Sequence, residues 1–573
     1  MCAVYMTDLE RRACKDRVLS NDYMDMLVDF NLPAEDILLL EGDNPDYCEH
    51  IVTEDIRIIY VAASMVPPSV LGGYRYQYLP KCYGLLQDVS ALTEAGILPV
   101  MGPPLELTGR NVLVGIVDTG IRYGLPEFRR SDGSTRILSI WDQTNQQGNT
   151  PEGFVFGTEY TESEINANLE SGEALLVTDE NGHGTKVAGV IGGYDREGGY
   201  LGAAPGVTFV IVKLKQAKAY LRRFYQIPFD VPCYQETDIM MALQYLEQVA
   251  KKQNKPLVTC VALGTNLGAH DGSSLLNRYL DMLGSGRSRC MVVGGGNEGN
   301  AAGHYTGGLT RLNDSSVDVQ VEEIELLVGQ GEEGFWSELW GKAPGVYTVS
   351  IVSPSGETIP EIPYRLGQNQ EYSFIYAATR IQIAYIPVEL GSGQQLIAMR
   401  FRQPLPGIWK IRVYQQGDGE FHMWLPMRQF LKGDTYFLRP NPYSTLTEPA
   451  YGREVLAVSA YNSTDGSFYL NSGRGFATDG FIAPALAAPG VAIPTPLITE
   501  TGSSVAAAMM AGAAACFMQW AVIEENDILV NTNSVKNYLI RGADRRTDLV
   551  YPSREWGYGT LNLEGVFEVL AGL

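Results

Sequence analysis

The spacing of hydrophobic and polar residues changes twice along the chain, and each change predicts a different kind of structure. Between residues 91 and 305, short apolar runs alternate with segments in which hydrophobic residues recur every three or four positions. The expected strands are 112–117, 209–214, 257–263 and 290–293, and the expected helices are 236–253 and 274–283. This alternation predicts an α/β architecture with right-handed crossovers: a doubly wound parallel sheet with both faces covered.

The helical pattern disappears from residue 306 to 442, where alternating strands and Gly/Pro turns take over. The clearest strands are 347–352, which is followed by the turn Ser353-Pro354-Ser355-Gly356, and 407–414. We expect an antiparallel β-sandwich here. The α/β pattern then resumes with a strand at 455–460 and ends in an Ala/Met-rich helix from about 503 to 524. The β-rich block is therefore expected to be an insertion into one domain made of residues 91–305 and 443–573.

The first 90 residues form a third region. Helical periodicity at 22–30 precedes a mostly apolar strand at 56–61, and a run rich in Gly, Tyr and Pro follows from 67 to 80. This pattern predicts a small α+β unit that ends in a linker.

Composition and charge narrow the function classes. The 573 residues are 45% hydrophobic and 19% charged, as in ordinary folded proteins. The net charge of -23 repels phosphate backbones and anionic lipid headgroups, so nucleic acid is not expected as a partner. No run reaches the roughly 20 apolar residues of a membrane span, and the first ten residues lack the basic and apolar regions of a secretory signal. We therefore expect cytoplasmic synthesis without a Sec signal.

The cysteines are spread along the chain without any C-x-x-C pair. They are Cys2, Cys14, Cys48, Cys82, Cys233, Cys260, Cys290 and Cys516. This spacing favours buried thiols in a reducing compartment over a disulfide framework or a zinc site.

Three short motifs carry candidate chemistry. The strand 112–117 runs into Asp118-Thr119-Gly120, which places a carboxylate at the carboxyl end of an expected parallel strand, where open α/β sheets build their sites. His183, one of only five histidines, is flanked by Gly182 and Gly184 just before a helix of small residues. Taken singly, each residue has a structural alternative, because an aspartate after a strand can cap a turn and a histidine between glycines can be a polar turn residue.

The third motif is Thr501-Gly502-Ser503-Ser504-Val505-Ala506, at the first turn of the long Ala/Met-rich helix. The N-terminus of that helix offers unpaired N–H groups and a positive dipole to a developing oxyanion. Serine is also a preferred N-cap, so capping is the structural alternative.

Together the motifs resemble those of the subtilases, the subtilisin-like serine peptidases, in which Asp, His and Ser follow in this order. The resemblance implies a triad of Asp118, His183 and Ser504, with Asn297 in Gly294-Gly295-Gly296-Asn297-Glu298-Gly299 as oxyanion donor. Further similar segments are Gly202-Ala203-Ala204-Pro205 and Ala487-Ala488-Pro489-Gly490. By the same resemblance, the substrate-binding residues are Ala262, Leu263, Gly264, Gly295 and Gly296.

The helix after Ser504 departs from the family, since Ala508 and Met509 stand where subtilases commonly have Pro and His. It should therefore continue without a proline kink. With its N-terminal unit, the lack of a signal and the β-rich insertion, the chain resembles the Csp germination proteases of spore-forming clostridia, subtilases with an added jelly-roll domain. That resemblance implies packaging in the spore and a protein substrate, a cortex-lytic pro-hydrolase that is activated during germination.

The resemblance also implies that residues 1–90 are a prodomain, which assists folding, inhibits the enzyme and is removed by its own active site. The junctions Gln77–Tyr78 and Gln87–Asp88 both lie in suitable linker, and the sequence favours neither. No D-x-D-x-D-G loop is present, so no metal site or cofactor is expected and calcium dependence stays open.

Two other functions remain as alternatives to an active peptidase. The chain could be a catalytically inactive pseudoprotease that serves as a signalling scaffold, although no triad residue is missing. It could also be a β-sandwich adhesin that carries a relic catalytic domain. The tryptophans of the insertion, Trp336, Trp340, Trp409 and Trp424, are expected in the core rather than on a sugar-binding platform.

Overall fold

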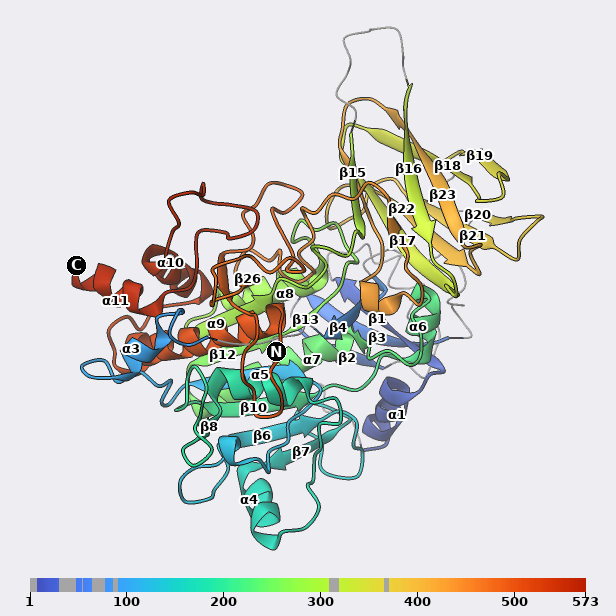
Figure 1. Cartoon of the computed structure of the whole chain (residues 1–573). Coiled ribbons are helices and arrows are strands. Elements are labelled where there is room, and N and C mark those ends of the chain that lie inside the picture. Colours follow the sequence, from blue (N-terminus) through green and yellow to red (C-terminus); the bar gives the residue numbers. More distant parts are fainter. Residues whose placement is uncertain are drawn as a thin grey trace.

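An eight-stranded sheet forms the centre of the protein (Figure 1). The computed structural model describes residues 8–29, 48–53, 55–63, 78–85, 91–308, 319–364 and 370–572. In spatial order the strands are β27 (Leu486–Pro489), β26 (Leu456–Tyr461), β14 (Arg289–Gly294), β12 (Leu257–Val261), β5 (Leu113–Asp118), β10 (Thr208–Lys213), β6 (Ile137–Asp142) and β7 (Thr158–Thr161). All neighbours pair in parallel except β7, which runs antiparallel to β6. The predicted parallel α/β sheet is confirmed.

Helices cover both faces of this sheet, as its apolar strands require. One face packs against α5 (His183–Gly192), α9 (Ser503–Met518), α10 (Thr532–Gly542) and α11 (Leu563–Ala571). The opposite face packs against α7 (Glu236–Gln253) and α8 (Leu275–Gly284). Three further helices, α3 (Ile97–Met101), α4 (Glu162–Ser171) and α6 (Ala219–Tyr225), lie around this body.

The helix α9 is buried over its whole length, with all sixteen of its residues inside the protein. Of the described residues, only Ser503–Ile523 is long and apolar enough to cross a membrane, and 83% of its most apolar window is buried within the protein. Its small residues permit a close approach to neighbouring chain: a Cβ at Gly512 would overlap Ala203 and lie 3.0 Å from the carbonyl oxygen of Ile191 in α5. The helix runs without a break to Met518, as predicted, and ends in a π-turn at Gln519–Ile523.

The antiparallel strands of the insertion form two sheets. One contains β15 (His304–Gly307), β24 (Phe421–Trp424), β17 (Gly334–Gly341), β22 (Gln395–Arg402), β21 (Arg380–Ile386) and β20 (Gln370–Ser373). The other contains β19 (Thr358–Ile362), β18 (Val346–Val352), β23 (Gly407–Gln416), β16 (Val319–Val328) and β25 (Tyr436–Phe437). Both sheets contribute side chains to one apolar core, so the β-rich insertion is a sandwich.

The four tryptophans of the insertion are buried, as expected. Trp409 lies in the core of the sandwich. Trp336, Trp340 and Trp424 pack in a second cluster that includes Tyr220 of α6 and so joins the sandwich to the α/β body. None of the four offers an exposed face for a sugar, which removes the feature that could have favoured the adhesin alternative.

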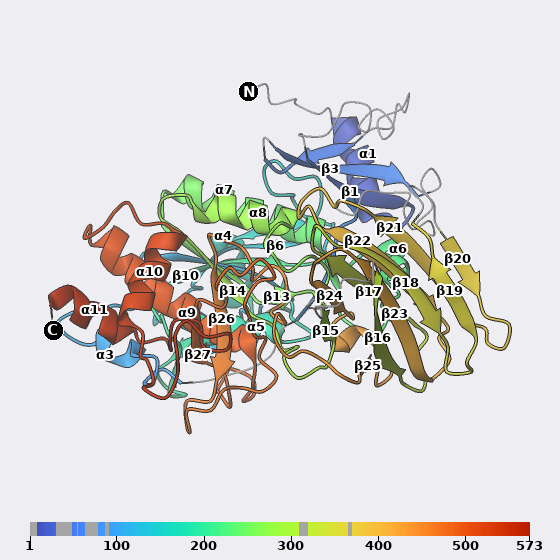
Figure 2. The same cartoon turned by 90° about the horizontal axis from the view of Figure 1, so that it is seen from above.

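The N-terminal unit contains α1 (Asp8–Leu19) and a sheet in the order β1 (Tyr23–Asp29), β3 (Ile56–Ala62), β2 (Glu49–Ile51). The helix expected at 22–30 is wrong. This segment is a strand because all seven of its residues pair antiparallel with β3, and tertiary pairing overrides the weak local periodicity of a short apolar run. Figure 2 shows the unit beside α7 and one edge of the sandwich.

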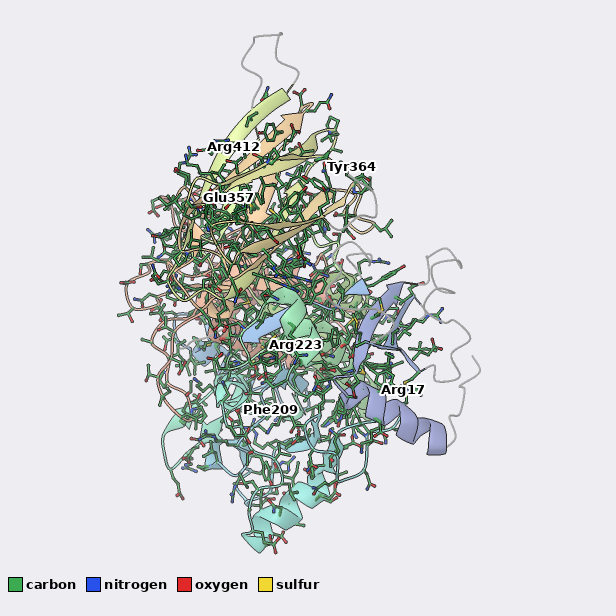
Figure 3. All side chains as sticks on the ribbon, turned by 90° about the vertical axis from the view of Figure 1, so that its right-hand side faces the viewer. Arg17, Phe209, Arg223, Glu357, Tyr364 and Arg412 are labelled. Atoms are coloured by element: carbon green, nitrogen blue, oxygen red, sulfur yellow. A yellow bond between two sulfur atoms is a disulfide. The ribbon has the colours of Figure 1, made fainter. Side chains whose placement is uncertain are left out.

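The cysteines only partly follow the expectation of free thiols. Cys14 and Cys48 form a disulfide between α1 and the residue before β2. The described thiols Cys82, Cys233, Cys260, Cys290 and Cys516 are buried and free, and Cys2 lies outside the described residues. In Figure 3, Arg17 marks α1 and Arg412 marks the outer strands of the sandwich. The domain limits at residues 90, 305 and 442 stay a prediction.

Candidate active site

Three polar residues stand where elements begin or end at the carboxyl edge of the central sheet, and two of them, Asp118 and His183, are in direct contact. Asp118 is the last residue of β5, His183 is the first residue of α5, and Ser504 is the second residue of α9. The helices α5 and α9 pack against each other, and both contact β5. All three side chains are buried, with 0%, 3% and 0% of their surface exposed. The fold thus gathers into one region the acid, imidazole and hydroxyl that the motifs single out.

A buried carboxylate holds the imidazole. Nδ1 of His183 lies 2.8 Å from both Oδ1 and Oδ2 of Asp118, and the backbone N–H of Thr119 donates to the same Oδ1 at 2.7 Å. With Nδ1 donating to Asp118, Nε2 is the nitrogen that can accept a proton. A carboxylate in this position also stabilises an imidazolium.

A second buried carboxylate, Asp179, fastens the acid loop to the histidine helix. Its Oδ1 accepts hydrogen bonds from the Thr119 hydroxyl (2.8 Å) and the Gly182 N–H (2.8 Å). Its Oδ2 accepts from the N–H (2.9 Å) and the hydroxyl (2.6 Å) of Thr185. The motif analysis missed Asp179, and the only signal for it in the sequence is an acidic residue four positions before His183.

The glycine after His183 permits this close packing. A Cβ at Gly184 would overlap the carbonyl oxygen of Gly120 and lie 3.1 Å from Cβ of Asp118. The N–H of Gly184 also donates to the Thr119 hydroxyl at 2.9 Å. Any larger residue at this position would push α5 away from the end of β5.

The segment before Ser504 is tied to the histidine helix as well. Lys186 of α5 forms an ion pair with Glu500 at 2.5 Å, and the N–H of Gly502 donates to the carbonyl of Gly490 at 2.8 Å. Ser504 then enters the first turn of α9, where helix N–H groups have no intrahelical partner. Among the residues that the structure describes, the hydroxyl oxygens of Ser503 and Ser504 have no hydrogen-bond partner, although both are buried. A buried orphan hydroxyl has a free energy cost, which a substrate can remove by occupying the site.

Asn297 follows the carboxyl end of β14 and reaches the start of α9. Its Oδ1 accepts a hydrogen bond from the N–H of Ser503 at 2.9 Å. Because the oxygen end of the amide is held by the helix, the Nδ2 end is the one that can donate elsewhere. A side-chain amide that donates to an oxyanion needs this orientation.

The predicted substrate-binding residues lie along two neighbouring segments. Leu263 and Gly264 form β13, Ala262 precedes them and is buried, and Gly295 and Gly296 follow β14. A Cβ at Gly264 or at Gly296 would overlap the side chain of Thr447, which therefore lies between the two segments. The Thr447 hydroxyl is buried and has no hydrogen-bond partner among the described residues. No motif identified Thr447, because it is brought here only by the fold.

The strand β13 belongs to a small sheet that contains part of the N-terminal region. In this sheet β4 (Cys82–Leu85) lies between β11 (Tyr234–Gln235) and β13 (Leu263–Gly264), and it pairs antiparallel with both. The register places Gly84 opposite Gly264 and Leu85 opposite Leu263. Residues 82–83 thus pair with β11 and residues 84–85 with β13, the segment predicted to bind substrate.

The insertion reaches the loop that carries Asn297. The backbone N–H of Arg428 donates to Oε2 of Glu298 at 3.0 Å. Asn266 donates to the same oxygen at 3.4 Å and to the carbonyl of Leu425 at 3.2 Å. Nearby, the ring of His270 stacks on Trp424 with centroids 4.1 Å apart. These contacts hold the loops after β13 and β14 against the sandwich.

No candidate metal centre was found within the described ranges, where no three His, Cys, Asp or Glu side chains are grouped as metal ligands would be. The four histidines other than His183 have structural partners: His50 bonds Gln244, His270 stacks on Trp424, and His304 bonds His422.

Glu298 gives a test of the electrostatics beside Asn297. Burial raises the pKa of Glu298 from 4.5 to about 7. The stabilisation of the folded state by the neutral carboxyl is full below pH 4.5 and is lost as the pH rises through 7. We expect Glu298→Gln, which stays neutral, to have a free energy of unfolding at pH 9 that is higher than that of wild type by about 3 kcal/mol, and to match wild type at pH 4.5. Thermal unfolding between pH 4.5 and 9 measures this.

The matched control is Glu152→Gln, at an exposed position, which should follow the pH dependence of the wild type. A Glu298→Gln protein that is no more stable than wild type at pH 9 would contradict the assigned cost of the buried charge.

Comparisons with known proteins agree with this geometry. A 132-residue part of the chain is 29% identical to the major intracellular serine protease of Bacillus subtilis (strain 168); it is 22% of this chain and spans about a third, 32%, of that protein. The solved structure of the CspB protease of Clostridium perfringens superposes with a TM-score of 0.72 at 28% identity, covering 84% of this chain and 97% of that one. The family model of the subtilases, peptidase family S8, matches residues 109–321 and 434–559, more than half of the chain. The chain therefore belongs to the subtilase family of serine proteases, which are hydrolases.

Proposed function

We propose that the protein is an active serine endopeptidase that uses Asp118, His183 and Ser504, and that it removes its own N-terminal region. The observation that carries this proposal is the position of β4. An extended segment of the chain lies between β11 and β13, paired on both edges as a peptide substrate would be, next to the predicted substrate-binding residues.

In the proposed reaction, Ser504 attacks the carbonyl carbon of the scissile peptide. Nε2 of His183 takes the hydroxyl proton as general base and later returns it to the leaving amine as general acid. Asp118, bonded to Nδ1, keeps the ring in the required tautomer and stabilises the imidazolium. Asp179 is a positioning residue for Asp118 and His183. Its hydrogen bonds with Thr119 and Thr185 set the distance between β5 and α5.

The oxyanion of the tetrahedral intermediate would be held at the start of α9. Nδ2 of Asn297 and the backbone N–H of Ser504 are the proposed donors, and the helix N-terminus adds a positive dipole. The buried hydroxyl of Ser503 has no partner among the described residues and is adjacent in the chain, so it is a further candidate donor.

The register of β4 bears on where the chain is cut. Gly84 and Leu85 pair with Gly264 and Leu263, two of the predicted substrate-binding residues. This favours a cut within residues 86–90, hence the Gln87–Asp88 junction over Gln77–Tyr78. Gln77, Gln87 and Asp88 themselves lie outside the described residues.

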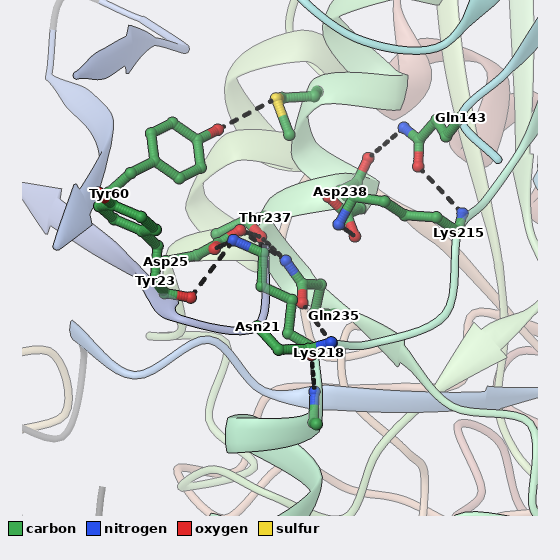
Figure 4. Close-up of polar contacts among 12 residues, drawn as sticks. Asn21, Tyr23, Asp25, Tyr60, Gln143, Lys215, Lys218, Gln235, Thr237 and Asp238 are labelled. Atoms are coloured by element: carbon green, nitrogen blue, oxygen red, sulfur yellow. Dashed lines mark hydrogen bonds and ion pairs between the residues drawn. The ribbon is translucent and has the colours of Figure 1, made fainter. Parts of the chain in front are cut away.

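The N-terminal unit is proposed to act as a prodomain that stays docked on the catalytic body. Lys218, just before α6, forms a buried ion pair with Asp25 of β1 (Figure 4). It also donates to the carbonyl of Arg17 at 2.9 Å. Gln235 donates to the same carboxylate at 2.6 Å. Burial lowers the pKa of Lys218, so the charge of Asp25 is needed to hold it there. Removing one partner of such a pair is costly, which makes it a strong anchor.

Gln235 of β11 contacts both the N-terminal unit and β4. Gln235 bonds Asp25 through its side chain and pairs with Cys82 through its backbone. Docking of the N-terminal unit and occupation of the channel by β4 are therefore mechanically linked, and this supports a combined role of the unit as folding aid and inhibitor.

We further propose that the physiological substrate is a spore-cortex-lytic pro-hydrolase and that the enzyme is packaged in the spore. Likeness to the CspB protease over 97% of that chain and 84% of this one supports this proposal. The β-sandwich would stiffen the loops beside the active site rather than bind a ligand, since Arg428 and Leu425 hold Glu298 and Asn266. The competing function is a pseudoprotease scaffold of the same fold.

The nucleophile gives the decisive test. We expect the recombinant wild-type chain to yield an N-terminal fragment that ends within residues 86–90, and Ser504→Ala to stay whole, because no other group supplies the attacking oxygen. Intact-mass spectrometry measures both. Ser131→Ala, at an exposed position, keeps the nucleophile and serves as the matched control that is still cut. A wild type that folds cooperatively but stays uncut would favour the scaffold.

The oxyanion site gives a second test. We expect Asn297→Ala to lower kcat by about 10²–10³-fold with little change in KM, because the donor acts mainly on the transition state. Steady-state cleavage of a peptide substrate measures this. An equal loss in the exposed variant Asn300→Ala, or a pure rise in KM for Asn297→Ala, would contradict the assignment.

The physiological proposal is tested by mixing purified protein with the cortex-lytic pro-hydrolase of the same host. We expect a single truncation of the pro-hydrolase and a gain of cortex-hydrolysing activity with wild type and neither with Ser504→Ala, read by N-terminal sequencing and by the turbidity of decoated spores. Cleavage of a general peptide without cleavage of the pro-hydrolase would remove the germination role and leave the peptidase standing.

A further inference from the structure

Two buried cysteines lie across the boundary between β4 and the catalytic body. Cys82 is the first residue of β4, and Cys233 immediately precedes β11, the strand that pairs with β4. Both side chains have 0% of their surface exposed, and neither belongs to the Cys14–Cys48 disulfide. The proposed peptidase mechanism uses neither thiol.

The pairing of the two strands directs both thiols to one place. Cys82 is opposite Gln235, and Cys233 is two residues before Gln235, so both side chains project from the same face of the small sheet. They belong to one apolar cluster, and the neighbouring Cys233 contributes, after burial, to the raised pKa of Cys82. Tyr220 and Tyr225 of α6 lie in the same cluster and shield the pair from water.

Cys233 lies outside the residues of β11 that pair with β4. Its N–H donates to the side chain of Gln216 at 3.0 Å, and its carbonyl accepts from Ala217 at 2.8 Å. Diagonal cross-strand neighbours lie about 7–8 Å apart, so the two Cβ atoms must approach each other by a few ångström to reach the roughly 4 Å of a disulfide. The short segment before β11 is the part that would move.

We propose that Cys82 and Cys233 are a redox pair whose disulfide locks β4 in the substrate channel and keeps the enzyme inhibited until the bond is reduced. This inference rests on the proposed peptidase function for its inhibitory effect, though the bond itself does not require catalysis. After a cut beyond residue 85, the bond would join the N-terminal fragment covalently to the catalytic body.

The oxidant in the proposed step is a low-molecular-weight disulfide such as oxidised glutathione. The thiolate of one cysteine attacks a sulfur of this disulfide, its S–S bond breaks, and one glutathione thiolate leaves. The second cysteine then attacks the mixed disulfide and expels the other glutathione. Two protein thiols are oxidised by two electrons, and the two protons end on the two glutathione thiols. Reduction by a dithiol reverses both steps.

Burial sets when this exchange can occur. The apolar surroundings raise the pKa of Cys82, so little reactive thiolate exists while β4 is in place. Oxidation therefore belongs to folding or to moments when β4 has left the channel, and the closed bond is then protected from exchange. The disulfide would therefore form before β4 is fully seated, and a strong reductant would be needed to break it.

The first experiment reads the bond without relying on catalysis. The Ser504→Ala chain is refolded with oxidised glutathione, its remaining thiols are alkylated, and it is digested with trypsin. Cys82 falls in the peptide 82–110 and Cys233 in 224–251, each of which holds a single cysteine. We expect these two peptides to be joined in most molecules and released by dithiothreitol. Their absence, while the Cys14–Cys48 link is present, would overturn the proposal.

The second experiment reads inhibition in the wild-type chain. Peptide cleavage by the oxidised, processed protein should be lower by about tenfold or more than after reduction, since a tethered fragment competes at an effective concentration of about 1 mM. Cys82→Ser and Cys233→Ser should lose this redox response, and Cys260→Ser, another buried thiol, should keep it. A Cys82–Cys233 disulfide that forms but leaves the rate of peptide cleavage unchanged would overturn the proposed inhibition. Linkage in Ser504→Ala combined with an uncut wild type would support the bond and contradict the peptidase function instead.

Discussion

The active region depends on one arrangement of buried charge, the carboxylate of Asp118 held against the imidazole of His183 at the end of a central strand. A charge without solvent is tolerated only when it is paired and hydrogen-bonded, and here the imidazole and the Thr119 N–H meet that need. Asp179, a second buried carboxylate, is likewise satisfied by hydrogen bonds, from the Gly182 N–H and the Thr185 hydroxyl. Because both carboxylates bond backbone as well as side chains, β5 and the start of α5 cannot move apart without leaving a charge unpaired. The positions of the other proposed catalytic groups depend on this fixed contact between the end of β5 and the start of α5.

The long helix α9 supplies the other half of the site by packing rather than by charge. Its alanines, methionines and glycines bury it completely, and Gly512 permits the close contact with the chain around α5. A helix that is buried all round has no freedom to rotate, since any rotation would create overlaps or voids. Ser504 is therefore placed by the whole length of the helix, and Asn297 fixes its first turn through the Ser503 N–H. This rigidity fits a site in which hydroxyl groups stay buried without partners among the described residues until a peptide arrives.

The two added regions act on this core from opposite sides. The sandwich holds the loops after β13 and β14 through Arg428, Leu425 and the stacked Trp424, so it stiffens one wall of the channel. The N-terminal unit docks by a buried ion pair and inserts β4 between β11 and β13. Under the proposed function, β4 keeps other peptides out of the channel while it stays there. The proposed disulfide between Cys82 and Cys233 would then determine when β4 is released.

The sequence alone was enough to predict the parallel sheet, the β-rich insertion, the unkinked α9 and the three motifs. These features depend on residues that are close together in the chain. Prediction from the sequence failed at 22–30, where a short apolar run reads equally as helix or strand and pairing with β3 decided the outcome. It also missed Asp179, Thr447, the Cys14–Cys48 bond and the seating of β4. These depend on contacts between residues far apart in the chain, and only the tertiary structure, which brings buried groups into hydrogen-bonding and packing distance, could determine them.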